Sequence, residues 1–336
     1  MSGVRPIGVL IPTRNCAALA PAHVASLQGW AGLVQEFVVV DSNSQDGTVE
    51  IFKAGLSGLP ARFLTHPPGL YQSWNFGIQN ISAKYVYIST VGDSITREGL
   101  EHLFAVAEEF QSDVVISKPR FIDAAGQALP DNRWLIDVIL RRLQIKRPRL
   151  LSMTEQFLFT VTNLWGAILG SSASNLYRAD CLKQRPFPTE YGMAGDGGWG
   201  ILNIFEVKIA ITPELFSTFR FHEKACAAAD YYVESLPLKL FRLAQSVIAR
   251  QGPRNPAVPR ILEEIQWPEL EAALEVVCAR QAKLEQLRRQ NIPWVLNSVA
   301  WQARAARARA NRRISAITDR ALAASRASGP GPEAQG

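Results

Sequence analysis

The sequence predicts an α/β protein with a mostly parallel central sheet, flanking helices and a helical C-terminal extension. Two observations lead to this fold class. Apolar runs rich in β-branched and aromatic residues alternate with helix-like segments over roughly the first 125 residues, and this alternation is typical of parallel sheets with right-handed crossovers. After about Glu234 the sequence is almost wholly helical.

Each expected element follows from one of these runs. Strands buried on both faces are expected at 7–11, 37–40, 62–64, 85–88 and 114–116. Helices are expected at 21–30, 48–54, 73–81, 97–110, 134–145 and 154–165, and then at 236–250, 259–289 (interrupted by Pro268) and 293–326. We therefore expect a first domain over 1–232, a helical extension over 233–327, and a disordered Gly/Pro-rich tail over 328–336.

Composition and charge exclude several classes of protein. Hydrophobic residues make up 47% of the chain and charged residues 20%, which is typical of a globular protein rather than a disordered one. The net charge of +6 is too small to indicate a nucleic-acid binder. The basic character is concentrated near the C-terminus, because residues 283–326 contain ten basic residues and only two acidic ones.

Cysteine spacing and hydropathy favour a cytoplasmic protein. The four cysteines stand far apart without a CxxC pair, which argues against a zinc site or a disulfide framework and fits a reducing compartment. The apolar run 7–12 is too short for a signal-peptide core, and the stretch 157–170 falls short of the roughly 20 residues that span a bilayer. A peripheral location on the inner face of the membrane stays compatible with this composition.

Polar residues follow three of the expected strands. Thr13, Asp41 and Asp93 stand just after strand ends, and the carboxyl ends of parallel strands line the ligand crevice of such sheets. Asp41 could accept a hydrogen bond from a ribose hydroxyl or a base N–H, or it could belong to an ordinary strand–turn–helix joint. Asp93 could hold a divalent cation together with phosphate oxygens, or it could cap the next helix.

A third segment places Asn75 and Gly77 inside an expected helix, where both residue types are mildly unfavourable. A buried Asn needs hydrogen-bond partners. The alternative interpretation is a helix whose glycine permits close packing.

Together these segments resemble the family 2 glycosyltransferases. The order is Ile11-Pro12-Thr13-Arg14-Asn15, then Asp41-Ser-Asn-Ser-Gln-Asp46-Gly47-Thr48, then Gly69-Leu-Tyr71-Gln-Ser-Trp-Asn75-Phe-Gly77, then Gly92-Asp93. The resemblance continues at Ser174-Asn175-Leu-Tyr-Arg178, Gly195-Asp196-Gly-Gly-Trp199 and Phe219-Arg-Phe-His222, and it covers residues 6–222. Each motif alone is weak, but four in this order within 93 residues are hard to produce by chance.

The resemblance implies an inverting transferase with the A-type nucleotide-sugar fold. Residues 1–232 would bind a nucleotide-diphosphate sugar, with a UDP-sugar favoured, and transfer the sugar to a saccharide or a lipid-linked saccharide in cell-surface polysaccharide or glycolipid synthesis. Asp41 would contact the nucleoside, Asp93 would hold a divalent metal (Mn or Mg), and Asp196 would be the general base. The donor-binding positions implied are Pro12, Thr13, Asn15, Asp41, Ser44, Tyr71, Asn75 and Gly92.

Two departures from the family pattern concern the metal and the base. Thr90 stands where the first acid of the metal motif would be, which leaves Asp93 as the one carboxylate there. His222 is the candidate second metal ligand, although a lone His is more often structural. The residue before the base is Gly195 instead of the common Glu, so a charge that could tune Asp196 is missing.

The C-terminal helix allows two interpretations. An apolar stripe recurs at steps of three and four, and Arg dominates the other faces. The helix could pack on the catalytic domain or on a second subunit in a homodimer, or residues 283–326 could bind an anionic membrane surface. Nucleic acid is not expected, because no aromatic platform accompanies the arginines. The stripe consists of Ile292, Val295, Val299, Ala303, Ala306, Ala310, Ile314, Ile317 and Ala321.

Two rival functions follow from the same residues. A non-catalytic member of the fold that binds a nucleotide-sugar or a partner protein is suggested by the thinned acidic motif. The retained Asp41, Asp93 and Asp196 argue against it. A nucleotidyltransferase would carry a Gly-rich basic signature beside the first strand, where Arg14 is the only basic residue.

Overall fold

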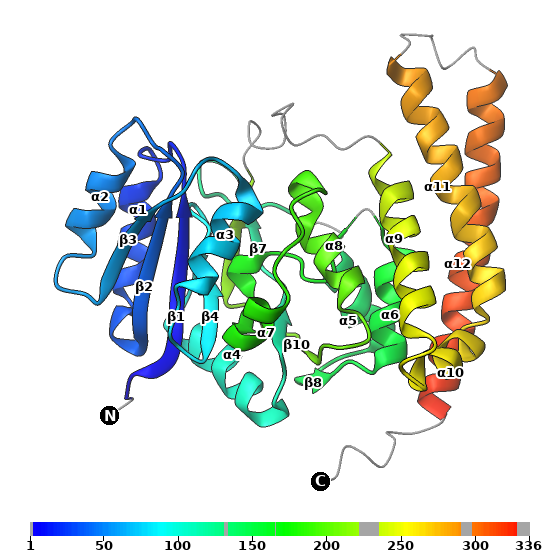
Figure 1. Ribbon diagram of the computed structural model, residues 1–336, viewed down its shortest axis with the longest axis horizontal. Helices are drawn as coiled ribbons and strands as arrows, with labels where there is room; N and C mark the ends of the chain where they lie inside the picture. Colours follow the sequence, from blue (N-terminus) through cyan, green and yellow to red (C-terminus); the bar gives the residue numbers. More distant parts are fainter. Residues whose placement is uncertain (1–2, 131–133, 165, 222–234, 290–297, 328–336) are drawn as a thin grey trace. The chain divides into compact units, whose positions relative to one another are not determined.

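The computed structural model describes residues 3–130, 134–164, 166–221, 235–289 and 298–327. The chain divides into two compact units. The first unit comprises residues 1–151, 169–199 and 206–232, and the second comprises 152–168, 200–205 and 233–336. Figure 1 shows the strands in blue to green and the long C-terminal helices in yellow to red.

The first unit is built on a mostly parallel sheet, as the sequence predicts. Within the described residues the sheet has eight strands in the order β3-β2-β1-β4-β9-β6-β10-β8. β9 lies antiparallel to β4 and β6, and β8 lies antiparallel to β10, while the other pairs are parallel. The bounds are β1 Arg5–Thr13, β2 Val34–Asp41, β3 Ala61–Thr65, β4 Tyr85–Ile88, β6 Val114–Ser117, β8 Arg149–Leu150, β9 Leu176–Arg178 and β10 Ile209–Thr212.

A small second sheet in the same unit joins β5, β11 and β7, in that order. Their bounds are Ser94–Ile95, Ser217–Arg220 and Arg120–Ile122. β11 runs antiparallel to β5 and parallel to β7. This sheet matters for the site because β5 begins immediately after Asp93.

Helices connect the strands close to the predicted positions. The helices of the first unit are α1 Ala20–Gln28, α2 Thr48–Gly55, α3 Leu70–Gln79, α4 Arg97–Phe110, α5 Leu135–Leu143 and α7 Ala179–Gln184, and α8 Gly195–Leu202 begins in it. Short 3-10 turns form η1 Ala31–Leu33, η2 Ser172–Ser174 and η3 Gly192–Ala194. α3 begins three residues before the predicted start, because Tyr71 and Trp74 are buried on the same face of the helix.

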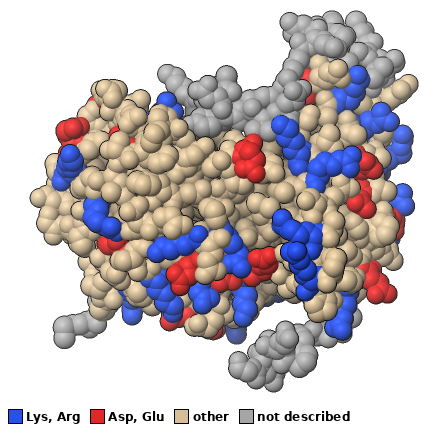
Figure 2. Space-filling model, viewed as in Figure 1, with Lys and Arg blue, Asp and Glu red and all other residues tan. Residues whose placement is uncertain are grey.

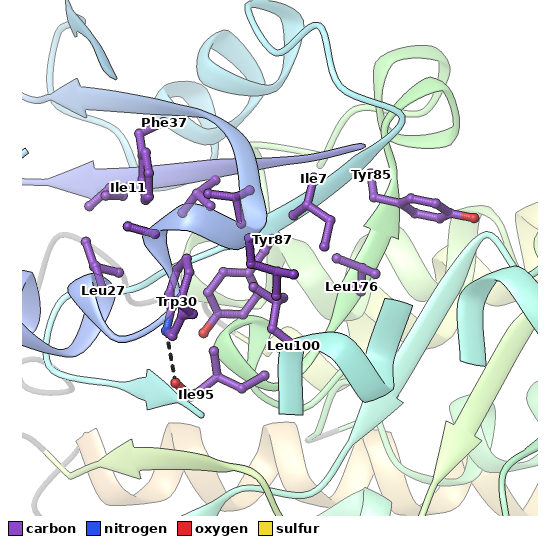
Figure 3. Packing of buried hydrophobic residues seen from close by; sticks show 14 of the residues in the cluster. Ile7, Ile11, Leu27, Trp30, Phe37, Tyr85, Tyr87, Ile95, Leu100 and Leu176 are labelled. Atoms are coloured by element: carbon purple, nitrogen blue, oxygen red, sulfur yellow. Dashed lines mark hydrogen bonds between the residues drawn. The ribbon is translucent and has the colours of Figure 1, made fainter. Parts of the chain in front are cut away.

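The core lies between the sheet and its helices (Figure 3). Trp30 stacks on Phe37 and meets Tyr87 edge to face, and its indole N–H donates to the Ile95 carbonyl at 3.1 Å. Each such side chain contributes roughly 1.5–3 kcal/mol by its burial. The close-packing interpretation of Gly77 is confirmed, because a Cβ there would lie 2.3 Å from Leu10.

The second unit is helical. α6 spans Met153–Thr162, α9 Leu236–Gln251, α10 Ala257–Glu264, α11 Trp267–Arg289 and α12 Ser298–Ala327. α11 packs against α9 and α12, and α12 also contacts α6. The predicted interruption of the helix at 259–289 is confirmed, because the segment forms two helices. Gln266, with φ +52°, separates them, and Pro268 stands in the first turn of α11, where its missing N–H leaves no hydrogen bond unmade.

The apolar stripe of the C-terminal helix packs against α11. Ala303, Ala310, Ile314, Ile317 and Ala321 are all buried. Arg313 and Arg320 form ion pairs with Glu269 of α11 at 3.0 and 3.2 Å. Ile292 and Val295 lie outside the described residues. The described part of the stripe therefore packs within the helical extension, on α11, a partner that neither expected interpretation named. Figure 2 shows blue basic side chains on the visible face of this helical region.

Among the helices within the described ranges, none has both the length and the apolar composition needed to cross a bilayer.

Candidate active site

Three neighbouring parallel strands bring the predicted polar residues to one edge of the sheet. β1 lies between β2 and β4. Thr13 and Asp41 are register partners at the ends of β1 and β2, and the Ser89 N–H just after β4 donates to the Leu10 carbonyl at 2.8 Å. The expected crevice edge is therefore present. Pro12 lies half-buried in β1, opposite Val40.

Asp41 is buried, and its neighbours fill part of the hydrogen-bond acceptor capacity of its carboxylate. Its Oδ1 accepts from the Thr13 hydroxyl at 2.9 Å and from the Ser44 hydroxyl at 2.6 Å, and its Oδ2 accepts from the Ser44 N–H at 2.8 Å. A carboxylate can accept about four hydrogen bonds. One acceptor position on Oδ2 is therefore left for a ligand donor such as a base N–H or a ribose hydroxyl.

The loops after β1 and β2 are held together by side chains that cap backbone groups. The Asn15 N–H donates to Ser44 Oγ, and Asn15 Oδ1 accepts from the Gln45 N–H, both at 2.9 Å. Asn15 adopts φ +45°, which Asn tolerates better than most residues. Asp46 accepts from the Ala17 N–H at 2.9 Å and from the Thr48 hydroxyl at 2.6 Å, and these bonds lower its pKa. These bonds fix the loops after β1 and β2 in place before any ligand binds.

Asp93 is fixed from two directions. Its Oδ1 accepts from the Arg220 N–H at 2.8 Å, and its Oδ2 accepts from the Thr90 hydroxyl at 2.6 Å. Burial raises the pKa of Asp93 to about 6, although both of these bonds lower it. Gly92 has φ +104°, a left-handed conformation that favours glycine. Thr90, at the position of the missing family acid, therefore supports the carboxylate of Asp93.

His23 is a component of this site that sequence reasoning missed. Its Nδ1 lies 3.2 Å from the Asp93 carbonyl and its Nε2 lies 3.1 Å from Ser89 Oγ. A carbonyl can only accept, so we assign the proton to Nδ1 and the acceptor role to Nε2. Burial lowers the pKa of His23 to about 4, so the ring is neutral. No sequence signal marks this role, since a lone His on a helix is more often structural.

Asp196 stands in the first turn of α8. Its Oδ1 accepts from the Gly197 N–H at 2.8 Å. The residue as a whole is half-buried. The protein packed around the carboxylate raises its pKa to about 6, while the hydrogen bonds from Gly197 and Tyr71 oppose this shift. A carboxylate with this pKa is ionised at neutral pH and remains basic enough to accept a proton.

Tyr71 and Asn75 of α3 face the segment that leads to Asp196. The Tyr71 ring is buried and stacks on Phe187, and its hydroxyl lies 3.1 Å from the Met193 carbonyl. The Asn75 amide donates to the Phe187 carbonyl at 2.8 Å and accepts from the Phe187 N–H at 2.9 Å. Asn75 is therefore engaged with the backbone, and the structure does not group it with Thr13 and Asp41.

A pocket of about 310 Å³ lies beside these residues. Its lining comes from three separate parts of the first unit: the end of β1, the start of α3, and the segment before α8. The lining residues are Arg14, Pro68, Gly69, Leu70, Tyr71, Gln72, Thr189 and Gly192. The pocket therefore extends from the sheet edge at the carboxyl end of β1 towards the segment that carries Asp196.

At the position of the expected metal motif, the described residues provide one carboxylate, that of Asp93. They contain no cluster of three or more His, Cys, Asp or Glu residues that could hold an ion, and His222 lies outside the described residues. A divalent ion commonly binds through one or two carboxylates plus substrate phosphates. Each oxygen of Asp93 accepts one hydrogen bond and keeps a second acceptor position. Asp93 thus fits an ion whose remaining ligands come from a diphosphate.

Comparison with known families agrees with this geometry. A family model described as glycosyl transferase family 2 matches residues 8–166, which include most of β1, all of β2 and α3, and Asp93. This match covers a little less than half of the chain, and over these residues the chain is similar to the family 2 glycosyltransferases. The search of curated proteins found no match to the chain.

Solved structures show the same fold. TarS 1–349 of S. aureus in complex with UDP-GlcNAc has a TM-score of 0.59 at 17% identity, covering 96% of this chain and 92% of that one. Its complex with UDP has a TM-score of 0.57 at 16% identity with the same coverage. The mannosyltransferase PcManGT from Pyrobaculum calidifontis, in complex with GDP-Man and Mn²⁺, has a TM-score of 0.50 at 15% identity, covering 98% and 78%. The expected A-type glycosyltransferase fold is confirmed.

Proposed function

We propose that this chain transfers a sugar from a nucleotide-diphosphate donor to an acceptor hydroxyl with inversion at the anomeric carbon, using Asp196 as general base. The observation that carries the proposal is the pocket shared by the end of β1 and the segment before Asp196. A donor bound at the sheet edge and an acceptor near Asp196 would meet there. We favour a UDP-sugar as donor, a choice supported by the UDP and UDP-GlcNAc bound in the TarS structures.

The base assignment follows from the chemistry of the acceptor. A sugar hydroxyl is a poor nucleophile until a carboxylate within hydrogen-bond reach accepts its proton during attack. Asp196 has a pKa of about 6, so it is ionised at neutral pH, and it follows the segment that lines the pocket. The proton of the acceptor hydroxyl passes to Asp196, the acceptor oxygen bonds to the anomeric carbon, and the nucleoside diphosphate leaves in the same displacement.

The donor side uses the preorganised sheet edge. Asp41 has an acceptor position left for the nucleoside, and the segments around Asn15 and Ser44 are tied to each other. Arg14 lines the pocket and provides positive charge beside the place where a diphosphate would lie. Gly92 holds the backbone turn that places Asp93 at the same edge.

We propose that Asp93 holds a divalent ion, Mn²⁺ or Mg²⁺, with His222 as a candidate second ligand. When bound, such an ion stabilises the negative charge that develops on the departing diphosphate. The Mn²⁺ in the structure of PcManGT supports this choice. Burial and the bonds from Thr90 and Arg220 hold the Asp93 carboxylate in one orientation, so its geometry is preset for a ligand.

For the acceptor we propose a saccharide or a lipid-linked saccharide of a cell-surface polysaccharide or glycolipid pathway. The basic residues of 283–326 support an encounter with an anionic membrane surface, where such acceptors reside. A homodimer remains a second proposal for the exposed side of the C-terminal helices.

A nucleotide-release screen tests the proposed function. Purified protein is incubated with UDP-, GDP- and dTDP-sugars and with Mg²⁺ or Mn²⁺, and the released nucleoside diphosphate is measured with and without candidate acceptors. We expect release from one nucleotide class that requires Asp196. The matched control is Asp180→Asn, an exposed aspartate in the first turn of α7. Binding of UDP without acceptor-dependent release from any sugar would favour the non-catalytic rival.

A further inference from the structure

The Cα of Gly195 is packed directly against the ring of Tyr71. A Cβ added at Gly195 would lie 2.4 and 2.5 Å from two ring carbons of Tyr71 and 2.6 Å from the Pro188 carbonyl oxygen. Real Cβ atoms do not approach other atoms so closely. The space that a side chain at position 195 would need is therefore taken by an aromatic ring from α3.

Tyr71 is held in this position from several sides. Its ring stacks on Phe187 with centroids 5.4 Å apart and meets Trp74 edge to face at 5.1 Å. Its hydroxyl donates to the Met193 carbonyl at 3.1 Å. Phe187 is itself fixed by its paired hydrogen bonds with Asn75. The ring is thus a rigid element, and it borders both the pocket and the residue before Asp196.

We propose that Tyr71 is a positioning residue for Asp196, and that Gly195 is required because the Tyr71 ring occupies the place of a side chain at that position. In this chain a phenol beside the base replaces the charged neighbour that a Glu at position 195 would provide. The inference rests on the proposed role of Asp196 for its catalytic meaning, but the contact itself does not depend on that role.

The electrostatic surroundings of Asp196 agree with this geometry. Two titratable groups that interact with Asp196 are Tyr71 from α3 and Tyr177 from β9. Burial and the Asp196 charge raise the pKa of Tyr71 well above its ordinary value, so the phenol stays protonated. The Tyr71 O–H that donates to the Met193 carbonyl is also within reach of the Asp196 carboxylate, and donation to the carboxylate favours the ionised form of Asp196.

A stability measurement tests the contact without any substrate. The pKa of Asp196 is raised by burial, so the stability difference between Asp196→Asn and the wild type grows with pH and levels off above the folded-state pKa. The melting temperatures of both proteins are measured from pH 5 to pH 8, in the wild-type background and in the Tyr71→Phe background. We call the pH above which this stability difference stays constant the levelling-off pH. We expect it to move upward in Tyr71→Phe, because the hydroxyl no longer stabilises the ionised carboxylate of Asp196.

The matched control is Tyr87→Phe. Tyr87 is a buried tyrosine whose hydroxyl also donates to a backbone carbonyl, that of Ala173 at 3.0 Å. This variant should lower the melting temperature and leave the levelling-off pH unchanged. An equal levelling-off pH in Tyr71→Phe and in the wild type would overturn the inference, because Tyr71 would then serve packing alone.

A second pair of variants tests the role of Gly195. Gly195→Ala should lower the melting temperature strongly in the wild type and clearly less in a Tyr71→Ala background, where the Cβ finds space. In the Tyr87→Phe background the full loss should remain. Equal losses in all three backgrounds would show that the Pro188 carbonyl alone excludes the side chain, which overturns the required pairing of Gly195 with Tyr71.

Turnover separates this inference from the proposed function. If Asp196→Asn keeps its turnover while Tyr71→Phe moves the levelling-off pH, the general-base assignment fails and the positioning contact stands. If Asp196→Asn loses turnover while Tyr71→Phe leaves both the levelling-off pH and the pH dependence of turnover unchanged, the contact fails and the base assignment stands.

Discussion

The carboxylate of Asp93 accepts a hydrogen bond from the backbone N–H of Arg220 at 2.8 Å, across 127 positions of the chain. Arg220 also donates through its guanidinium to the Gly92 carbonyl at 3.3 Å and to the Ala124 carbonyl at 2.7 Å. The small sheet of β5, β11 and β7 therefore clamps the turn that carries Asp93. Because Asn keeps an acceptor oxygen for the Arg220 N–H, the effect of Asp93→Asn can be read as a change of ligand binding.

Asp93→Asn should remove most of the metal-dependent part of donor binding, because a neutral amide is a much weaker ligand for a hard cation than a carboxylate. Calorimetric titration of UDP, and of GDP in parallel, with and without Mn²⁺ measures this effect. Asp123→Asn in the neighbouring loop is a suitable control. Equal metal-dependent affinity in the wild type and in Asp93→Asn would remove Asp93 from the metal site.

Asp196→Asn should leave nucleotide affinity nearly intact and reduce turnover by about 10²–10⁴-fold, the usual cost of losing general-base assistance. Steady-state kinetics with the donor and acceptor found by the release screen provide the measurement. A turnover within a few-fold of the wild type would mean that another residue takes the proton.

The turnover should rise with pH through about 6, because Asp196 can accept a proton only in its ionised form and its pKa is about 6. The profile of kcat/KM from pH 5 to pH 8 measures this. Asp93 has a similar pKa, so the pH dependence of nucleotide affinity must be measured separately. A turnover that is flat across pH 6 at saturating donor would contradict the assignment.

Asp196→Asn should also stabilise the protein above pH 6. The folded-state pKa of about 6 exceeds the ordinary value of 3.8, so the stability contribution of Asp196 is fully present below about 3.8 and is lost as the pH rises to about 6. The ionised form of Asp196 then lowers the free energy of unfolding by up to about 3 kcal/mol, a loss that the neutral amide of Asn avoids. Urea unfolding at pH 5 and pH 8 measures the difference, and the exposed Asp180→Asn is the control that should bring no such gain in stability.

Neutralising exposed arginines of α12 should weaken binding to anionic vesicles. Arg309 and Arg312 are exposed, and each basic residue near such a surface contributes about 1 kcal/mol, or roughly five-fold in affinity. Sedimentation with vesicles of anionic and of neutral lipid, at low and high salt, measures this for Arg309→Gln/Arg312→Gln. Arg260→Gln on α10, also exposed, is the control. Loss of a dimer without loss of vesicle binding would favour the subunit interface.

Much of the fold follows from local sequence pattern. The apolar runs at 7–11, 37–40 and 85–88 form β1, β2 and β4, because continuous apolar residues are stable only when both faces of a strand are covered. Parallel strands place their carboxyl ends at one edge. The positions of Thr13 and Asp41 at that edge therefore follow from the strand pattern alone.

The tertiary structure alone decided how the remaining site residues are used. Tyr71 meets the Met193 carbonyl across 122 positions, Asn75 meets Phe187 across 112, and His23 meets the Asp93 carbonyl across 70. The apolar stripe of the C-terminal helix likewise has a definite partner in α11. Periodicity and turn chemistry act over a few residues, so the sequence by itself determined which segments become strands and helices. The contacts between distant segments depend on how those elements pack, and packing decided that Gly195 leaves room for Tyr71 beside Asp196.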